Sequence, residues 1–308
     1  MRRILVVGEA LVDVVVRPGG STSEHPGGSP ANVALGLARL GRPTSLLTSL
    51  GDDDRGRAVL DHLGASGVEV VAGSVRPGPT SVATATLGED GQATYAFDLR
   101  WELADAELPA EPLAVHTGSI GAVLAPGGAV VEQLVRAARS ASTTSYDPNL
   151  RPDLMGSADA VRARVEALVE VSDVVKLSDE DAGWLVPGVP VEELAATWLQ
   201  RGPALVVVTM GGSGMYALCR AGEVAVQAPR VDVADTVGAG DSAMAALLDG
   251  LAEHDLLGAD RREALTAIST DVLEQVVRHA VSAAAITVSR PGADPPTRAD
   301  LARPARRL

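Results

Sequence analysis

The chain has 308 residues, 46% of them hydrophobic, so it can bury a large core as one large domain or as two. Its formal net charge of −14 excludes nucleic acid and anionic membrane surfaces as partners, because nothing supplies a basic field. No apolar run approaches the roughly 18 residues of a membrane span, and the single cysteine, Cys219, excludes an internal disulfide and predicts a reducing cytoplasm.

Short apolar runs and segments with helical periodicity alternate along most of the chain. Such alternation predicts a mainly parallel sheet with helices on both faces, the α/β class. The predicted strands are Ile4–Val7, Thr44–Thr48, Leu113–Thr117, Thr143–Tyr146, Asp173–Leu177, Ala204–Thr209 and Met215–Cys219. The predicted helices are Ala31–Leu40, Gly128–Ala141, Ala158–Val171, Val191–Leu199 and Ser242–Leu251.

Two parts of the N-terminal third break this rhythm. Leu11–Arg17 alternates between apolar and polar residues, as a half-buried strand does. Thr80–Leu87 and Ala93–Asp98 flank a glycine-containing turn at residues 88–91, the pattern of a β-hairpin. We expect these segments to form a small second sheet.

Three aromatic residues gather in and after this hairpin: Tyr95, Phe97 and Trp101. One interpretation is a local core for a thin sheet. The other is an apolar wall on a lid that closes over a small ligand and expels water.

The segment Gly27–Gly41 contains the signals of a helix and further residues that helix formation does not explain. Three residues punctuate the helix: Ser29 as a cap, Pro30 in the first turn and Gly41 as the stop. Those signals leave Gly27 and Gly28 unexplained, and glycine lets a backbone approach a ligand closely. Asn32 can both donate to and accept from a hydroxyl. The segment is therefore a candidate ligand site.

The segment Asp235–Asp241 runs directly into the predicted helix Ser242–Leu251. A glycine-rich turn at a helix start points backbone N–H groups and the positive end of the helix dipole at one place, which can hold an anion. Asp241 stands beside this turn and can accept a proton. Phosphoryl transfer to an alcohol needs that combination.

Two other classes of function compete with phosphoryl transfer. The stretch Gly238–Ala243 also fits the dinucleotide fingerprint Gly-x-Gly-x-x-Ala of NAD-dependent oxidoreductases, but that fingerprint should follow the first strand of a βαβ unit, and here it comes late. The chain could also be a non-catalytic sugar or nucleotide sensor, because a fold alone does not establish turnover.

Together these segments resemble the ribokinase-like (pfkB) carbohydrate kinase family, and more closely its fructokinase branch. Gly27–Gly41 is similar to the N-terminal signature of the family, and Asp235–Asp241 to its C-terminal signature. The other similar segments are Gly8–Asp13, Gly51–Gly56, Asp147–Pro152, Thr209–Gly214 and Ser289–Thr297. The resemblance implies one ribokinase-like α/β/α domain over residues 1–308, with a β-sheet lid formed by about 11–26 and about 72–103. It also implies a homodimer that pairs through the lid.

The resemblance carries site residues with it. Asp241 matches the catalytic base, and the amides of Gly238, Ala239 and Gly240 match the anion hole for the transferred phosphoryl group. The residues implied to bind the sugar are Asp13, Gly28, Asn32 and Arg151. The residues implied to bind ATP are Lys176, Thr209, Gly211, Gly214, Gly238 and Gly240, with residues 283–292 as the wall on the adenine side.

The resemblance also implies Mg²⁺ with ATP and, as in some relatives, a monovalent cation such as K⁺ near Asp235. Many members carry Asn-x-x-Glu to organise Mg²⁺, whereas this chain has Ser178 and Asp181 at those places. A helix cap followed by acidic residues would explain both without a metal. An outer-shell role for Asp181 is the alternative, since Mg²⁺ usually keeps several waters.

The resemblance favours fructose, phosphorylated on its terminal hydroxyl, as the substrate. Arg151 could instead face the carboxylate of 2-keto-3-deoxygluconate, or simply pair with a nearby acid. Ribose, other ketoses and nucleosides stay open. Sugar phosphates are less expected, because only Arg76 and Arg100 supply positive charge near the lid.

Overall fold

The computed structural model describes residues 2–88, 92–103 and 111–302. The turn residues 89–91 of the predicted hairpin and the end of the basic C-terminal tail lie outside this part. Within it, no helix is long and apolar enough to cross a membrane.

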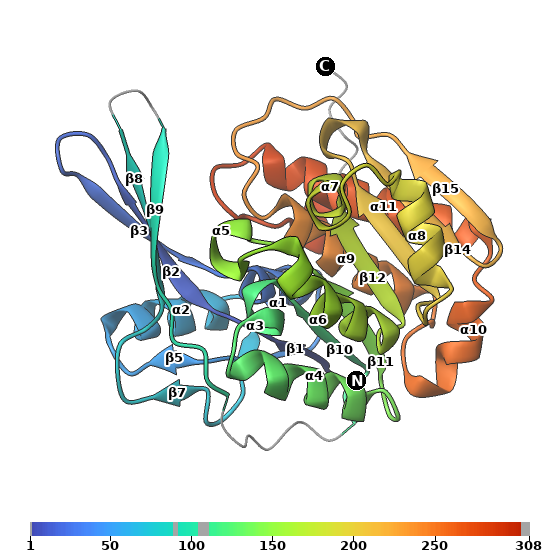
Figure 1. Cartoon of the computed structure of the whole chain (residues 1–308), viewed down its shortest axis with the longest axis horizontal. Coiled ribbons are helices and arrows are strands. Elements are labelled where there is room, and N and C mark those ends of the chain that lie inside the picture. Colours follow the sequence, from blue (N-terminus) through green and yellow to red (C-terminus); the bar gives the residue numbers. More distant parts are fainter. Residues whose placement is uncertain (1, 89–91, 104–110, 303–308) are drawn as a thin grey trace.

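A nine-stranded sheet forms the centre of the molecule (Figure 1). Its spatial order is β15-β14-β13-β12-β11-β10-β1-β4-β6. Neighbours are parallel from β6 to β13, and β14 and β15 continue one edge antiparallel. The strands are β1 (Ile4–Val7), β4 (Thr44–Leu47), β6 (Val68–Val70), β10 (Ala114–Gly118), β11 (Thr143–Asp147), β12 (Val174–Ser178), β13 (Leu205–Thr209), β14 (Met215–Cys219) and β15 (Gly222–Val226). All the predicted strands of this sheet are confirmed to within one residue at each end.

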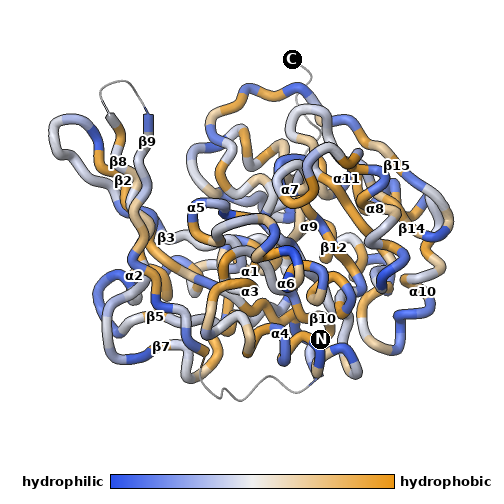
Figure 2. The backbone as a smooth tube through the Cα atoms, viewed as in Figure 1, coloured by the Kyte–Doolittle hydropathy of each residue, from blue (hydrophilic) through white to orange (hydrophobic). Residues whose placement is uncertain are grey.

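Helices cover both faces of the sheet, so the fold is a three-layer α/β/α sandwich. Ile4 and Val6 of β1 pack into one core cluster, and Leu5 and Val7 pack into the other, because strand side chains alternate between faces. The first cluster includes α1 (Ser29–Arg39), α2 (Asp54–Gly64), α9 (Ala239–Glu253) and α11 (Thr270–Val288). The second includes α3 (Ser119–Val123), α4 (Gly127–Ala138), α6 (Ala158–Glu170), α7 (Asp179–Leu185) and α8 (Val191–Leu199). Figure 2 shows hydrophobic residues concentrated in the interior of this body.

Three short helices and two 3₁₀ turns complete the described part of the α/β body. Helix α5 (Pro152–Met155) comes after β11, and α10 (Arg262–Thr266) lies between α9 and α11. The last described helix is α12 (Arg298–Leu301). A single 3₁₀ turn, Gly211–Ser213, follows β13, and a second, Ala259–Arg261, precedes α10.

A second sheet projects from one side of this body (Figure 1). Its strands are β2 (Leu11–Val16), β3 (Thr22–Gly27), β8 (Val82–Leu87) and β9 (Ala93–Asp98), in the order β3-β2-β8-β9. The expected pairing of β8 with β9 and the expected place of β2 are confirmed. Strand β3 has no apolar alternation and contains Pro26, which an edge strand tolerates because one side of its backbone is not paired.

Candidate active site

The start of α9 carries the predicted anion site. Gly238 is the N-cap and adopts a left-handed conformation with φ 76°. A side chain there would also meet Ala293, since an added Cβ would lie 2.7 Å from the Cβ of that residue. Asp241 follows in the first helical turn and is 6% exposed. The first N–H groups of a helix have no partner within the helix, so this turn presents donors beside a buried carboxylate.

Helix α1 brings a second set of polar groups to Asp241. Ser29 Oγ donates to Asp241 Oδ1 at 2.7 Å, and Asn32 Nδ2 donates to Oδ2 at 2.9 Å. The N-cap of α1 is Gly28, with φ 104°, and Ser29 makes no capping bond. The expectation that Ser29 caps the helix is therefore wrong. An added Cβ at Gly28 would lie 2.6 Å from the carbonyl oxygen of Glu9, so glycine is required for this close approach.

The surroundings of Asp241 act on its pKa in opposite directions. Burial raises the pKa, while the hydrogen bonds from Ser29 and Asn32 and the charges of Lys176 and Arg151 lower it. The net direction is upward. A carboxylate with a raised pKa is a stronger proton acceptor, and the same bonds fix its orientation.

Asp13 of β2 lies close enough to Asp241 to be affected by its charge. Burial raises its pKa, the charges of His25 and Arg151 lower it, and the charge of Asp241 raises it. An added Cβ at Gly27 would lie 2.1 Å from Asp13 Oδ2, so that glycine makes room for the carboxylate. Of the sugar-side candidates, Asn32 contacts Asp241 directly, Asp13 and Arg151 interact with it through charge, and Gly28 is the N-cap of the helix that carries Asn32.

The loop after β11 supplies Asn149 and Arg151. Asn149 has φ 38° and donates to Ser29 Oγ at 2.7 Å and to Asp241 Oδ1 at 3.4 Å. Arg151 donates to Asn149 Oδ1 at 2.7 Å and to the carbonyl oxygen of Leu150 at 2.9 Å. Among the described residues, Arg151 makes no ion pair with an acid, and its role toward a substrate stays a prediction.

Lys176 and Asp147 form a buried ion pair next to this centre. The two atoms Lys176 Nζ and Asp147 Oδ2 are 2.9 Å apart, and the side chains are 3% and 1% exposed. Burial raises the pKa of Asp147 to about 6, although Lys176 lowers it. Lys176 Nζ also lies 3.5 Å from the point where Gly240 would carry a Cβ. Its charge is therefore directed at the same helix start as Asp241.

The turn predicted to bind nucleotide lies at the carboxyl ends of neighbouring strands. Thr209 ends β13 and donates to the carbonyl oxygen of Leu177 at 3.4 Å. Gly211 and Gly214 bound the 3₁₀ turn with φ 49° and 97°. An added Cβ at Gly214 would lie 2.0 Å from the carbonyl oxygen of Val226, so this turn needs glycine. These residues make no direct contact with Asp241 in the described structure.

Both candidate metal-binding residues, Asp181 and Asp235, accept hydrogen bonds from backbone N–H groups. Asp181 and Ser178 form a capping box at the start of α7, and Asp181 Oδ1 also accepts from the N–H of Leu150 at 2.8 Å. Asp235 accepts from the N–H groups of Val237 at 3.0 Å and Gly292 at 2.9 Å. The helix-cap interpretation of Ser178 and Asp181 is confirmed, and the two metal roles stay predictions.

The three hairpin aromatics divide into two environments. Phe97 pairs through Ala83 with Asp13 across the small sheet, so it shares the face of Asp13, and Tyr95 follows on that face. The rings of Tyr95 and Phe97 stack with centroids 6.2 Å apart and are exposed. Trp101 is buried, and its Nε1 donates to the carbonyl oxygen of Gly121 at 2.8 Å.

Comparison with known proteins identifies the family. A fructokinase of Rhizobium leguminosarum bv. trifolii is 36% identical over 265 residues, which are 82% of this chain and 81% of the relative. A fructokinase of Solanum habrochaites is 30% identical over 310 residues, 95% of this chain and 92% of the relative. The crystal structure of a fructokinase with bound ATP from Xylella fastidiosa has a TM-score of 0.84 and 25% identity, covering 98% of this chain and 97% of that one. The model of the pfkB family carbohydrate kinases matches residues 1–300. The chain belongs to this family.

As a pfkB carbohydrate kinase, the protein is an ATP-dependent phosphotransferase that acts on a hydroxyl group of a sugar. The alternative of a dinucleotide fingerprint fails structurally as well. The glycine-rich start of α9 comes at the end of an irregular segment, residues 227–238, and the strand before that segment is the antiparallel edge strand β15. The first strand of a βαβ unit is absent at this place in the described structure.

Several polar residues of the kinase site escaped prediction. Ser29 was expected only to cap, and Asn149 and Asp147 were expected only as parts of a similar segment. Glu9 accepts from the N–H of Gly121 at 2.8 Å at the start of α3, and burial raises its pKa to about 7. For Glu9, Asp147 and Asn149 the available sequence signal was a polar residue at or just after the end of a buried parallel strand. Ser29 follows the mostly exposed strand β3 and had no such signal.

Proposed function

We propose that this kinase transfers the γ-phosphate of ATP to the terminal hydroxyl of fructose. The observation that carries the chemistry is the meeting of two helix starts at one buried carboxylate, Asp241, with Ser29 and Asn32 bonded to its oxygens. The choice of fructose is supported by the relatives at 36% and 30% identity, which are fructokinases.

On the sugar side, Asp241 would accept the proton of the attacking hydroxyl as its oxygen bonds to phosphorus. Asn32 and Asp13 would bind further hydroxyls, and the exposed rings of Tyr95 and Phe97 would cover the sugar. The small sheet would then act as the lid expected at about 11–26 and about 72–103, and its closure would exclude water.

On the phosphate side, the amides of Gly238, Ala239 and Gly240 would stabilise the charge of the transferred group. Lys176 adds a positive charge that is already aimed at Gly240. Thr209, Gly211 and Gly214 would hold the nucleotide beside it, at the end of β13. The contact of Gly238 with Ala293 and the bond from Gly292 to Asp235 support an adenine-side wall in the C-terminal segment.

The residues present fit a Mg²⁺ that arrives with the ATP phosphates. No group of three acidic, histidine or cysteine side chains that could hold a metal occurs in the described structure. Asp147 Oδ1 is buried and has no hydrogen-bond partner in the described structure. Asp181 lies close enough for its negative charge to raise the pKa of Asp147. Both suit outer-shell contacts to metal-bound water. When bound, Mg²⁺ neutralises phosphate charge.

Two further parts of the proposal concern K⁺ and assembly. We place a monovalent cation near Asp235, whose carboxylate already links two backbone segments. We also propose a homodimer through the small sheet, whose strands β3 and β9 are edges. Size measurement in solution and a rate comparison between K⁺ and Na⁺ buffers test these two points.

The substrate is tested by ADP release with Mg²⁺-ATP across fructose, ribose, 2-keto-3-deoxygluconate, adenosine and fructose 6-phosphate. We expect kcat/KM to be at least about 10-fold higher for fructose than for any other acceptor, a difference of about 1.4 kcal/mol in transition-state binding. A higher kcat/KM for 2-keto-3-deoxygluconate would instead assign Arg151 to the carboxylate of a sugar acid. Activity with none of the acceptors would overturn the proposal.

A further inference from the structure

A cavity lies at the base of the small sheet, and none of the residues around Asp241 lines it. Its volume is about 300 Å³, at the lower end of the range for small-molecule sites. The walls are β5 (Leu50–Gly51), the segment Arg76–Pro79 that begins in β7 (Val75–Arg76), the segment Leu99–Glu102 after β9, and Ala125–Pro126 before α4. We call this cavity the arginine pocket, because Arg76 and Arg100 line it.

Trp101 connects the arginine pocket to α3. One side of the residue lines the pocket, while its Nε1 donates to the carbonyl oxygen of Gly121. The N–H of Gly121 in turn donates to Glu9, which lies between β1 and β2. None of the proposed catalytic, sugar-binding or ATP-binding residues lines the pocket.

A dense hydrogen-bond network fixes one wall of the pocket. Asp53 accepts from the N–H and hydroxyl of Thr80 at 3.0 and 2.6 Å, and the Thr80 hydroxyl accepts from the N–H of Gly51 at 3.1 Å. An added Cβ at Gly51 would lie 2.2 Å from the carbonyl oxygen of Gly78. The segment Gly51–Gly56, which the phosphoryl-transfer chemistry does not use, thus holds the strand of Arg76 in place.

No ion pair neutralises the positive charge of the arginine pocket in the described part of the chain. Within the described residues, neither Arg76 nor Arg100 makes a side-chain hydrogen bond or an ion pair. Arginines elsewhere, such as Arg42 and Arg262, are paired with buried aspartates. Glu102 also lines the pocket, but its side chain is exposed and unpaired with either arginine. Two guanidinium groups that line one cavity can donate hydrogen bonds to the same anion.

The remaining lining determines what kind of anion fits. Pro77, Pro79, Pro126 and Leu99 give apolar walls, and Trp101 gives an aromatic one. A site with apolar walls and a few charged groups suits an organic ligand whose charge is at one end. Guanidinium groups match the oxygens of a phosphate by paired hydrogen bonds. We propose that the arginine pocket binds a sugar phosphate, with its phosphate between Arg76 and Arg100 and its ring against Trp101.

The choice of a hexose phosphate as the ligand rests on the proposed function, because the product of that reaction is a hexose phosphate. The existence of an anion site in the arginine pocket does not depend on the proposed function. Binding is measured by titration calorimetry with fructose 6-phosphate, while fructose and a non-hydrolysable ATP analogue saturate the catalytic centre. We expect one site per chain, weakened by added KCl because the contact is ionic. Inorganic phosphate should bind at least about 10-fold more weakly, since it lacks the ring.

The double variant Arg76→Gln/Arg100→Gln should lose at least about 10-fold in this affinity. It should keep its fructokinase rate and melting temperature, because both residues lie outside the catalytic centre. The matched control is Arg57→Gln/Arg136→Gln, two exposed arginines of α2 and α4, with unchanged binding. Absence of binding to the wild-type chain, equal binding by the arginine double variant, or equal binding of inorganic phosphate would each overturn the proposal. A separate fructose assay shows whether the proposed function itself has failed.

Discussion

Asp241 carries two opposing influences that a pH profile can separate. Burial raises its pKa, and the bond from Asn32 lowers it. The base must be ionised to accept a proton, so kcat/KM falls as pH drops through this pKa. We expect the acid limb above the ordinary value of about 3.9. In Asn32→Ala the limb should move to higher pH, because a bond that favours the charged form is gone. An acid limb at the same pH in the variant would show that Asn32 does not influence the pKa of the base.

Replacement of the base itself should affect turnover and spare nucleotide binding. Asp241→Asn keeps nearly the same shape but cannot accept the proton, so we expect kcat to fall by about 10² to 10⁴. The Kd for ATP should change less than about threefold, since the proton moves mainly in the transition state. Glu253→Gln, an exposed acid at the other end of α9, is the control and should keep its kcat. A variant Asp241→Asn with substantial turnover would show that another group accepts the proton.

At the scale of elements, prediction succeeded where one local rule decided the outcome. Seven strands of the central sheet, all except β6 and β15, are almost entirely buried and were predicted to within one residue at each end. Strands β6 and β15 are partly exposed and were not predicted. The helix starts at Gly28 and Gly238 were also visible as glycine-rich turns. Strand β3 was missed because its residues are mostly exposed and follow no alternation.

Contacts between distant elements could not be predicted from local patterns. The bond of Ser29 with Asp241 joins residues 212 positions apart, and that of Asn149 with Asp241 joins residues 92 apart. Ser29 is a good cap by type, yet Gly28 takes that place because only glycine fits beside the carbonyl of Glu9. The family resemblance located Asp241 and Asn32, whereas their direct hydrogen bond emerged only from the fold.

The start of α2 provides a prediction about an element. Asp53 caps this helix through the N–H of Gly56 and also binds Thr80. Burial raises its pKa, but these hydrogen bonds outweigh burial and lower it to about 2. Because the folded-state pKa is depressed, its stabilising effect is full above about pH 4 and is lost as pH falls toward 2.

Asp53→Ala should therefore lower the free energy of unfolding by about 1 to 2 kcal/mol at pH 7, the usual range for a lost cap. Urea denaturation measures this change, and at pH 3 the difference from wild type should shrink. Asp54→Ala is the control: this neighbouring acid is exposed, pairs only with Arg57 in the described structure, and should cost less than about 1 kcal/mol. Equal losses for the two variants would mean that the Thr80 and Gly56 bonds add nothing.

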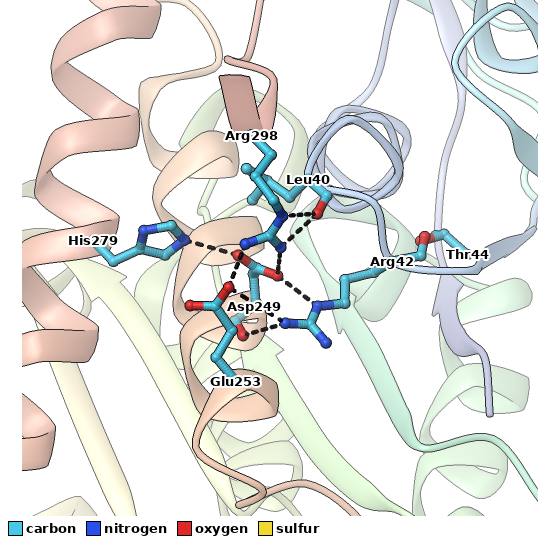
Figure 3. A network of polar contacts seen from close by, with 7 residues as sticks. All are labelled: Leu40, Arg42, Thr44, Asp249, Glu253, His279 and Arg298. Atoms are coloured by element: carbon cyan, nitrogen blue, oxygen red, sulfur yellow. Dashed lines mark hydrogen bonds and ion pairs between the residues drawn. The ribbon is translucent and has the colours of Figure 1, made fainter. Parts of the chain in front are cut away.

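At the scale of the whole molecule, α9 connects the catalytic centre with a second polar cluster (Figure 3). Asp249 lies eight residues after Asp241, or about 12 Å further along the axis. Its buried carboxylate accepts from Arg42 at 2.5 Å, Arg298 at 2.6 Å and His279 at 2.8 Å. Arg298 also donates to the carbonyl oxygen of Leu40. The cluster therefore joins the end of α1, the long helix α11 and the terminal helix α12 to α9.

Removal of this carboxylate should destabilise the fold without changing the chemistry. Asp249→Ala leaves Arg42 and His279 partly buried without their partner, and we expect a loss of about 3 kcal/mol in the free energy of unfolding. Glu253→Ala is the matched control, since this acid lies one turn further on α9 and binds Arg298 from a half-exposed position. Its loss should stay below about 1 kcal/mol. In both variants kcat for the sugar should be unchanged at temperatures well below melting. If Asp249→Ala lowered kcat at temperatures where the variant is fully folded, the cluster would also control the orientation of Asp241 through α9. Its role would then go beyond attaching the C-terminal helices.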